Sequence, residues 1–156
     1  MSAFLPPGIG MTSADQFDLL LPMFAMVLLT FAVWMAMYRS RIREIRARRI
    51  RIQNLATRGD AAQQFQDTRA ADNFQNLFEL PVLFHAGVLA TVMLGLASPL
   101  LEILAWVFVL SRVAHSFIHV TYNRVIHRFY VYAFGGFVLL AYWIVLAVGW
   151  LSVPAS

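Results

Sequence analysis

The sequence predicts an all-α integral membrane protein, a single domain over residues 1–156 built as a bundle of four transmembrane helices. The chain is 60% hydrophobic and only 13% charged, whereas a soluble domain carries more charge. Four apolar stretches are each long enough to cross a hydrocarbon core of about 30 Å. The basic residues gather in the segments that would connect these stretches on one side of the membrane.

The first predicted span covers residues 17–38, which are apolar except for Asp18 and Thr30. Residues 1–16 have no basic residue, so we expect an irregular lead and not a signal peptide. The span is followed by an arginine-rich segment, residues 39–58, with eight of the twelve basic residues of the chain. Such clustering beside a span indicates a cytoplasmic loop in contact with lipid headgroups, and we expect no nucleic-acid partner.

The other three predicted spans are residues 77–97, 100–120 and 129–151. The helical pattern of the second span begins earlier, at about residue 61, and Pro81 inside the span should bend it. Ser98-Pro99 forms an outer turn without positive charge, whereas residues 122–128 form a basic inner loop. This charge distribution places both chain ends outside, which is the periplasmic side if the membrane is a bacterial inner membrane.

Ionisable residues gather at the predicted inner side of the last three helices. Arg112 lies deep in its span, where an arginine needs a carboxylate, and Glu79 is the best-placed partner by depth. Asp72 lies closer to the cytoplasm and would serve a second arginine such as Arg128. These side chains would form one polar pocket, or else an ion-pair network that only locks the helices together.

His115 and His119 lie four residues apart, a spacing that can hold a metal or a haem edge. Two histidines are a weak signal, and hydrogen bonds to neighbouring helices explain them better, so we assign no metal ligand. The chain has no cysteine, so any thiol chemistry requires a bound thiol. Gly135-Gly136 would let helices approach closely, within one subunit or between subunits.

Two groups of residues resemble the MAPEG family, the membrane-associated proteins in eicosanoid and glutathione metabolism. Asn76-x-x-Glu79 is similar to the Asn-x-x-Glu of the family's second helix, and Arg112-Val-Ala-His115 matches a third-helix string of a prostaglandin-synthesising member. Arg69-Ala-x-x-Asn73 resembles an Arg-Ala-x-x-Asn motif of the same second helix. The two second-helix motifs cannot align in one register, and we prefer the one that places Glu79 on the family glutamate.

The resemblance implies a homotrimer that binds glutathione between subunits near the cytoplasmic face. Without gaps after the third-helix string, Arg124, Arg128 and Tyr132 fall on the family's Arg, Arg and Tyr positions. Arg128 is the candidate catalytic residue, because an arginine beside a thiol stabilises the thiolate. The residues expected to bind glutathione are Arg69, Asn76, Glu79, Arg112, His115, His119, Arg124 and Tyr132.

The sequence also departs from the family pattern. His119 stands where family enzymes have Tyr, and Asp72 and Gln75 replace arginines of the prostaglandin synthase, which argues against prostaglandin synthesis. The strings NLFELPVLF (residues 76–84) and SRVAHSFIH (residues 111–119) resemble an uncharacterised bacterial-type branch of the family. We therefore expect a transferase or peroxidase that uses glutathione or a similar thiol on lipophilic electrophiles from the membrane. The alternatives are a non-catalytic membrane scaffold or accessory subunit and, more weakly, a haem or metal protein with histidine ligands.

Overall fold

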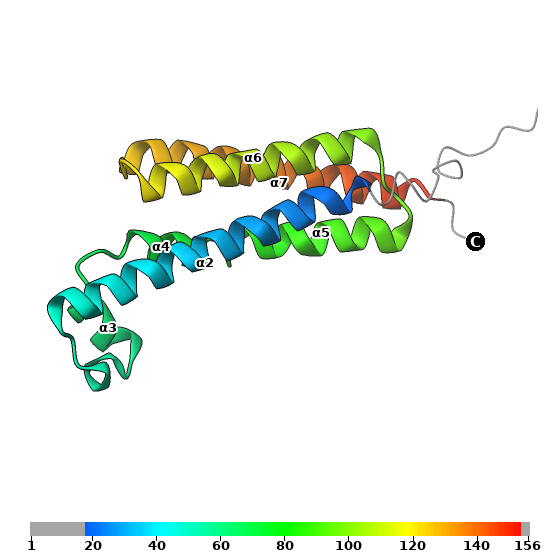
Figure 1. Cartoon of the computed structure of the whole chain (residues 1–156). Helices are drawn as coiled ribbons and strands as arrows, with labels where there is room; N and C mark the ends of the chain where they lie inside the picture. Colours follow the sequence, from blue (N-terminus) through cyan, green and yellow to red (C-terminus); the bar gives the residue numbers. More distant parts are fainter. Residues whose placement is uncertain (1–17, 154–156) are drawn as a thin grey trace, which may run out of the picture.

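The structure is a computed structural model that describes residues 18–153, in which all regular structure is helical (Figure 1). Four helical stretches are long and apolar enough to cross a membrane: Leu20–Arg48, Arg69–Leu94, Pro99–Val120 and Val125–Leu151. They confirm the predicted four-helix membrane fold. The elements are α2 (Leu20–Arg48), the 3-10 helix η1 (Ile52–Leu55), α3 (Arg58–Gln64), α4 (Arg69–Asn76), α5 (Leu80–Leu94), α6 (Pro99–Val120) and α7 (Val125–Leu151).

Helix α2 continues through the first half of the arginine-rich segment, which the sequence analysis describes as a loop. Arginine stands at every second or third position there, and arginine is a good helix former, so nothing interrupts the helix after Tyr38. The helix ends where Arg49 adopts a left-handed conformation with φ of 52°. Its 29 residues span about 44 Å at 1.5 Å per residue, so α2 projects beyond a hydrocarbon core of about 30 Å.

The second membrane helix is broken where the sequence predicts a continuous, bent one. Helix α4 ends at Asn76, residues 77–79 form a turn, and α5 begins at Leu80 with Pro81 in its first turn. Proline lacks an N–H and clashes with the carbonyl four residues earlier, so it suits the start of a helix. Helix α5 ends at Leu94, three residues before the predicted end of the span, where Gly95 takes a left-handed conformation with φ of 65°.

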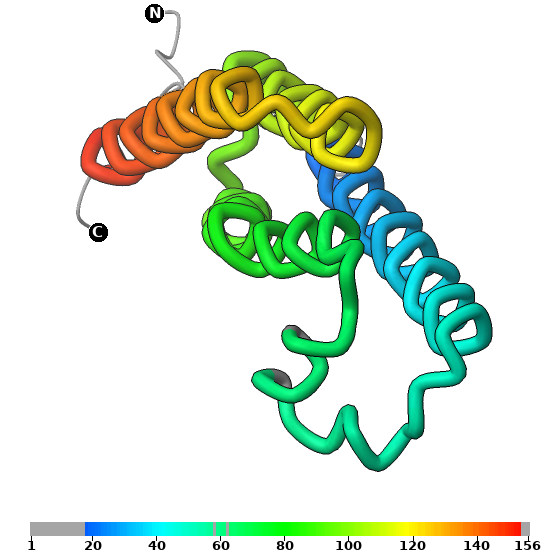
Figure 2. The backbone as a smooth tube through the Cα atoms, turned by 90° about the vertical axis from the view of Figure 1, so that its left-hand side faces the viewer, coloured from blue at the N-terminus to red at the C-terminus, as the bar shows by residue number. Residues whose placement is uncertain are grey.

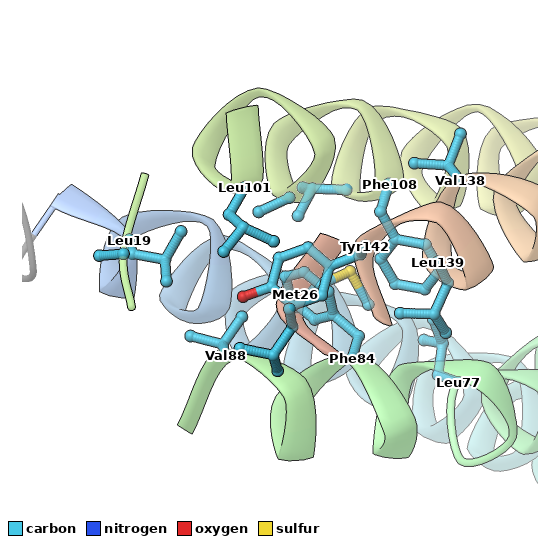
Figure 3. Close-up of a cluster of buried hydrophobic side chains, with 14 of the residues drawn as sticks. Leu19, Met26, Leu77, Phe84, Val88, Leu101, Phe108, Val138, Leu139 and Tyr142 are labelled. Carbon is cyan, nitrogen blue, oxygen red and sulfur yellow. The ribbon is translucent and has the colours of Figure 1, made fainter. Parts of the chain in front are cut away.

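Helices α6 and α7 form an antiparallel pair, α2 packs on α6 and α4, and α5 packs on α7 (Figures 1 and 2). The apolar core lies between α2, α5, α6 and α7 (Figure 3). Phe84 of α5 stacks on Phe108 of α6 with ring centroids 4.8 Å apart. Thr91 of α5 and Tyr142 of α7 share a buried hydrogen bond of 2.8 Å. Such bonds hold helices together in a membrane, where burial of apolar surface gives little driving force.

At Gly135 the backbone of α7 lies close to side chains of α6. A Cβ added at Gly135 would lie 2.5 Å from Ser111 Oγ and 3.2 Å from Arg112 Nη2. Ser111 cannot turn away freely, because its hydroxyl donates a 2.6 Å hydrogen bond to the Phe108 carbonyl. At the neighbouring Gly136, a Cβ would meet its nearest atom, Leu80 Cδ1, at 3.6 Å, which is ordinary contact. Gly135 therefore serves close packing within one subunit.

We predict that Gly135→Ala destabilises the protein by about 1–3 kcal/mol through overpacking. The measurement is the thermal unfolding midpoint of detergent-purified protein, with Gly136→Ala as the matched control on the same helix. The control should leave the midpoint unchanged or raise it, because alanine favours helix. Adding Ser111→Ala to Gly135→Ala should recover part of the lost thermal midpoint. If Gly135→Ala and Gly136→Ala changed the midpoint equally, Gly135 would not be the site of close packing.

Candidate functional site

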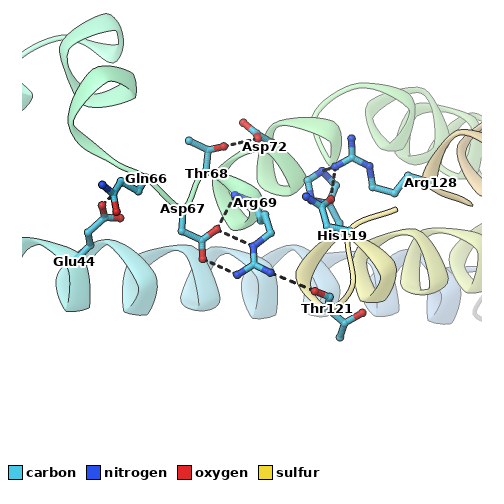
Figure 4. Close-up of polar contacts among 10 residues, drawn as sticks. Glu44, Gln66, Asp67, Thr68, Arg69, Asp72, His119, Thr121 and Arg128 are labelled. Carbon is cyan, nitrogen blue, oxygen red and sulfur yellow. Dashed lines mark hydrogen bonds and ion pairs between the residues drawn. The ribbon is translucent and has the colours of Figure 1, made fainter. Parts of the chain in front are cut away.

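A polar cluster forms along α6, where this helix packs on α4 and α7 near the α6–α7 turn. Figure 4 shows two of its members, His119 and Arg128. Helix α6 supplies a buried stripe of Arg112, His115, Ser116 and His119. These positions follow the i, i+3, i+4, i+7 spacing of one helix face. The flanking Phe117 is 63% exposed, so the other face of the same turns is apolar and open.

Arg112 is 1% exposed and does not pair with Glu79, contrary to the sequence-based expectation. The ion pairs within the described residues are Arg48–Glu44 and Arg69–Asp67. The Arg112 guanidinium lies 4.8 Å from the ring centroid of Tyr132 and 5.8 Å from that of Phe108. Its Nε and Nη2 atoms are buried and find no hydrogen-bond acceptor in residues 18–153.

Glu79 instead accepts a 2.8 Å hydrogen bond from the hydroxyl of Tyr132. The break before Pro81 explains the difference, because Glu79 lies in the turn that precedes α5 and is exposed there. Tyr132 thus stands between the two charges, with its ring against Arg112 and its hydroxyl on Glu79.

The expected pair of Asp72 and Arg128 is also absent. Asp72 accepts a 2.8 Å hydrogen bond from the Thr68 hydroxyl, at the start of α4. Arg128 Nη1 donates to His119 Nε2 at 2.9 Å and to Asn123 Oδ1 at 2.7 Å (Figure 4). Both partners precede Arg128 by less than ten residues, across the α6–α7 turn, and hold its guanidinium at that turn.

These contacts determine the histidine tautomers. Arginine only donates hydrogen bonds, so His119 Nε2 accepts and the ring proton lies on Nδ1, which is buried without a partner among the described residues. His115 Nδ1 lies 3.3 Å from the carbonyl oxygen of Arg128, to which it donates. His115 Nε2 is then free to accept from the Asn76 amide at 3.5 Å. No group of three or more His, Asp or Glu in the described part of the chain is placed to hold a metal.

Two expected site residues lie apart from this cluster. Arg69 forms an ion pair with Asp67 at 2.9 Å and donates to the carbonyl oxygen of Thr121 at 3.2 Å. Its side-chain hydrogen bond to Asp67 lowers the pKa of that carboxyl below the usual value. Arg124 is exposed at the start of α7. The structure thus brings together Asn76, Glu79, Arg112, His115, His119, Arg128 and Tyr132.

Residues that the sequence analysis did not select complete the cluster. Ser116 donates a 3.2 Å hydrogen bond to Oδ1 of Asn73, which is fully buried in α4. Ser116 follows Arg112 by one helical turn, so the stripe spacing would have found it. Asn73 belongs to the register that was not preferred, yet it faces α6 like Asn76. Asn123 has no comparable signal, because the turn that brings it to Arg128 has irregular backbone, with φ of 49° at Asn123.

A separate cavity of about 610 Å³ lies on the opposite face of α4, between this helix, α2 and the η1–α3 segment. The aromatic rings of Phe65, Phe74 and Phe78 line it together with Asp72 and Gln75. The polar side chains of Ser40, Arg41, Thr57, Asp67 and Thr68 also line it, so the cavity has both polar and aromatic walls. Helix α4 therefore separates the polar cluster from this cavity.

One comparison with known proteins gave a match. The model of the MAPEG family matches residues 19–148, which cover α2 to α6 and most of α7. No curated protein and no solved structure gave a match. The match covers most of the chain, and the chain therefore belongs to the MAPEG family.

Proposed function

We propose that the protein is a transferase or peroxidase that uses glutathione or a similar thiol to act on lipophilic electrophiles from the membrane. The observation that carries this proposal is the buried Arg112, whose Nε and Nη2 have no acceptor among the described residues. A buried charge without a partner is costly, and the ring faces of Tyr132 and Phe108 offset only part of that cost.

A ligand carboxylate would supply the missing acceptor for Arg112 through a charge-assisted hydrogen bond. Glutathione carries two carboxylates and one ammonium group, and the cluster offers the complementary charges. Glu79 is exposed beside Tyr132 and would bind the ammonium group, while Asn76 would bind a backbone amide of the ligand. We further propose that the site is completed between the subunits of a homotrimer, as the family resemblance implies.

Arg128 would act on the thiol of the bound ligand. Its Nη1 is held by His119 and Asn123, so the orientation of the guanidinium is fixed, and its other nitrogens can donate to a sulfur. A cation beside a thiol stabilises the thiolate, which is the reactive nucleophile. In a transferase reaction the thiol releases its proton and the thiolate sulfur bonds to an electrophilic carbon. On a substrate such as chlorodinitrobenzene the carbon–chlorine bond then breaks and chloride leaves. We place the arginine-rich side in the cytoplasm and the chain ends in the periplasm of a bacterial inner membrane.

A non-catalytic scaffold remains the second candidate, and a specific observation favours it. The bonds from Ser116 to Asn73, from Arg128 to His119 and from Tyr132 to Glu79 connect α4, α6 and α7 in one subunit without any ligand. Such a network fixes the packing of helices by itself. The two candidates differ in whether Arg112 binds an anion.

We predict that glutathione titrated into the detergent-purified protein gives saturable heat, and that Arg112→Ala weakens binding at least about tenfold, which is 1.4 kcal/mol. The physical reason is the loss of a buried, charge-assisted contact to a carboxylate. Arg51→Ala removes the same charge from an exposed position and should bind like the unmodified protein. Absence of binding, with Arg112→Ala changing only the melting temperature, would favour the scaffold.

We predict that Arg128→Ala lowers kcat for the addition of glutathione to chlorodinitrobenzene by roughly 10²–10³, the loss seen when one donor to a developing charge is removed. Arg128→Lys should retain part of the rate, because it keeps a cation near the sulfur. Turnover is measured on protein whose thermal midpoint shows that it is folded. Unchanged turnover in Arg128→Ala would exclude the catalytic role of this residue.

A further inference from the structure

One face of α2 carries an exposed stripe that changes from apolar to basic along its length. Leu28 is 70% exposed, Met35 41% and Ile42 45%, whereas Met26, Val33 and Met37 on the other side are buried. The stripe follows the i, i+3, i+4, i+7 spacing of a single helix face. Its members are Leu28, Ala32, Met35, Arg39, Ile42, Arg43 and Arg46, all of them exposed.

The stripe arginines differ from the other arginines of α2. Arg39, Arg43 and Arg46 form no ion pair within the described residues. Arg48, on another face, pairs with Glu44 at 2.7 Å, and Arg41 lies over the Phe65 ring at 5.4 Å.

Glu44 is the acid of the arginine-rich part of α2, and it points away from the stripe. It accepts a 2.8 Å hydrogen bond from the backbone of Gln66, in the segment before α4 (Figure 4). The stripe therefore has three cations and no anion of its own.

The position of the stripe along α2 matches the boundary of a membrane. Residues 20–38 span about 28 Å, close to the thickness of a hydrocarbon core, so Arg39 lies at its edge. Arg43 follows about 6 Å further along the axis, within a headgroup layer that is about 5–8 Å deep on each side. The rings of Trp34 and Tyr38, 4.7 Å apart, lie just before Arg39, where interfacial aromatic residues are found.

We propose that this stripe binds an anionic phospholipid. The phosphate group lies between Arg39 and Arg43, with Arg46 beside it, and an acyl chain runs along Met35 and Leu28. Guanidinium groups bind phosphate oxygens in a bidentate manner, and each basic residue near an anionic membrane contributes about 1 kcal/mol. The lipid site lies on a different helix and a different face from the polar cluster, so it does not depend on the proposed thiol chemistry.

The experiment compares phosphatidylglycerol with phosphatidylcholine added to the detergent-purified full-length protein, with the thermal midpoint as the readout. We expect phosphatidylglycerol to raise the midpoint at lower concentration than phosphatidylcholine. The combined Arg39→Gln, Arg43→Gln and Arg46→Gln variant should reduce this selectivity at least about tenfold, because three cations that attract an anionic headgroup are lost. The selectivity should also fall with added salt, because exposed charges are screened.

The matched control combines Arg41→Gln, Arg48→Gln and Arg51→Gln. It removes the same charge from positions outside the stripe and should keep the lipid selectivity. Because the selectivity compares two lipids on the same variant, it does not depend on the thermal midpoint of that variant without lipid. Equal loss in both combined variants would overturn the proposal in favour of a general charge effect. A free anion would explain the result instead if inorganic phosphate gave the same shift as the lipid. If the combined Arg39, Arg43 and Arg46 variant kept the lipid selectivity but lost its oligomeric state, the proposal would be wrong and the stripe would be a contact between copies of the chain.

Discussion

The burial of a cation in an apolar helix bundle is the constraint on which the cluster of α4, α6 and α7 depends. Arg112 is 1% exposed, and its guanidinium has Tyr132 on one side and the backbone of Gly135 close by. Because Gly135 has no side chain, α7 approaches α6 closely enough to cover the charge. Tyr132, one turn earlier on α7, then reaches Glu79. The polar cluster and the tight α6–α7 packing are therefore one feature, and within the described residues Arg112 Nε and Nη2 remain without an acceptor.

The break before Pro81 decides how the second membrane helix contributes to the polar cluster. Helix α4 turns Asn73 and Asn76 toward α6, where they meet Ser116 and His115. Its opposite face lines the separate cavity with Phe74 and neighbouring residues. The break also leaves Glu79 in the turn before α5, where its carboxylate accepts the hydrogen bond from Tyr132.

Helix α2 similarly has two functions on two faces. Glu44 and Arg48 connect it to the segment before α4, so this face supports the helix that carries Asn73 and Asn76. The opposite stripe of Arg39, Arg43 and Arg46 has no ion-pair partner in the described part of the chain. The two sets of arginines lie on separate faces because α2 continues as a helix past the apolar span. An irregular loop would not hold them on opposite sides.

The sequence alone determined the four membrane helices, the family and three members of the buried stripe of α6, namely Arg112, His115 and His119, because hydropathy, arginine clustering and helical spacing are local properties of the chain. Asn76, His115 and Tyr132 were expected in one cluster, and the structure places them together. Depth along the helices correctly placed Glu79 near Arg112 but gave the wrong contact. Only the tertiary structure decided that Tyr132 stands between them and that Arg128 bonds to His119, because helix rotation and the break before Pro81 depend on packing against other helices. Sequence spacing fixes which side chains share a face, whereas packing decides what that face meets.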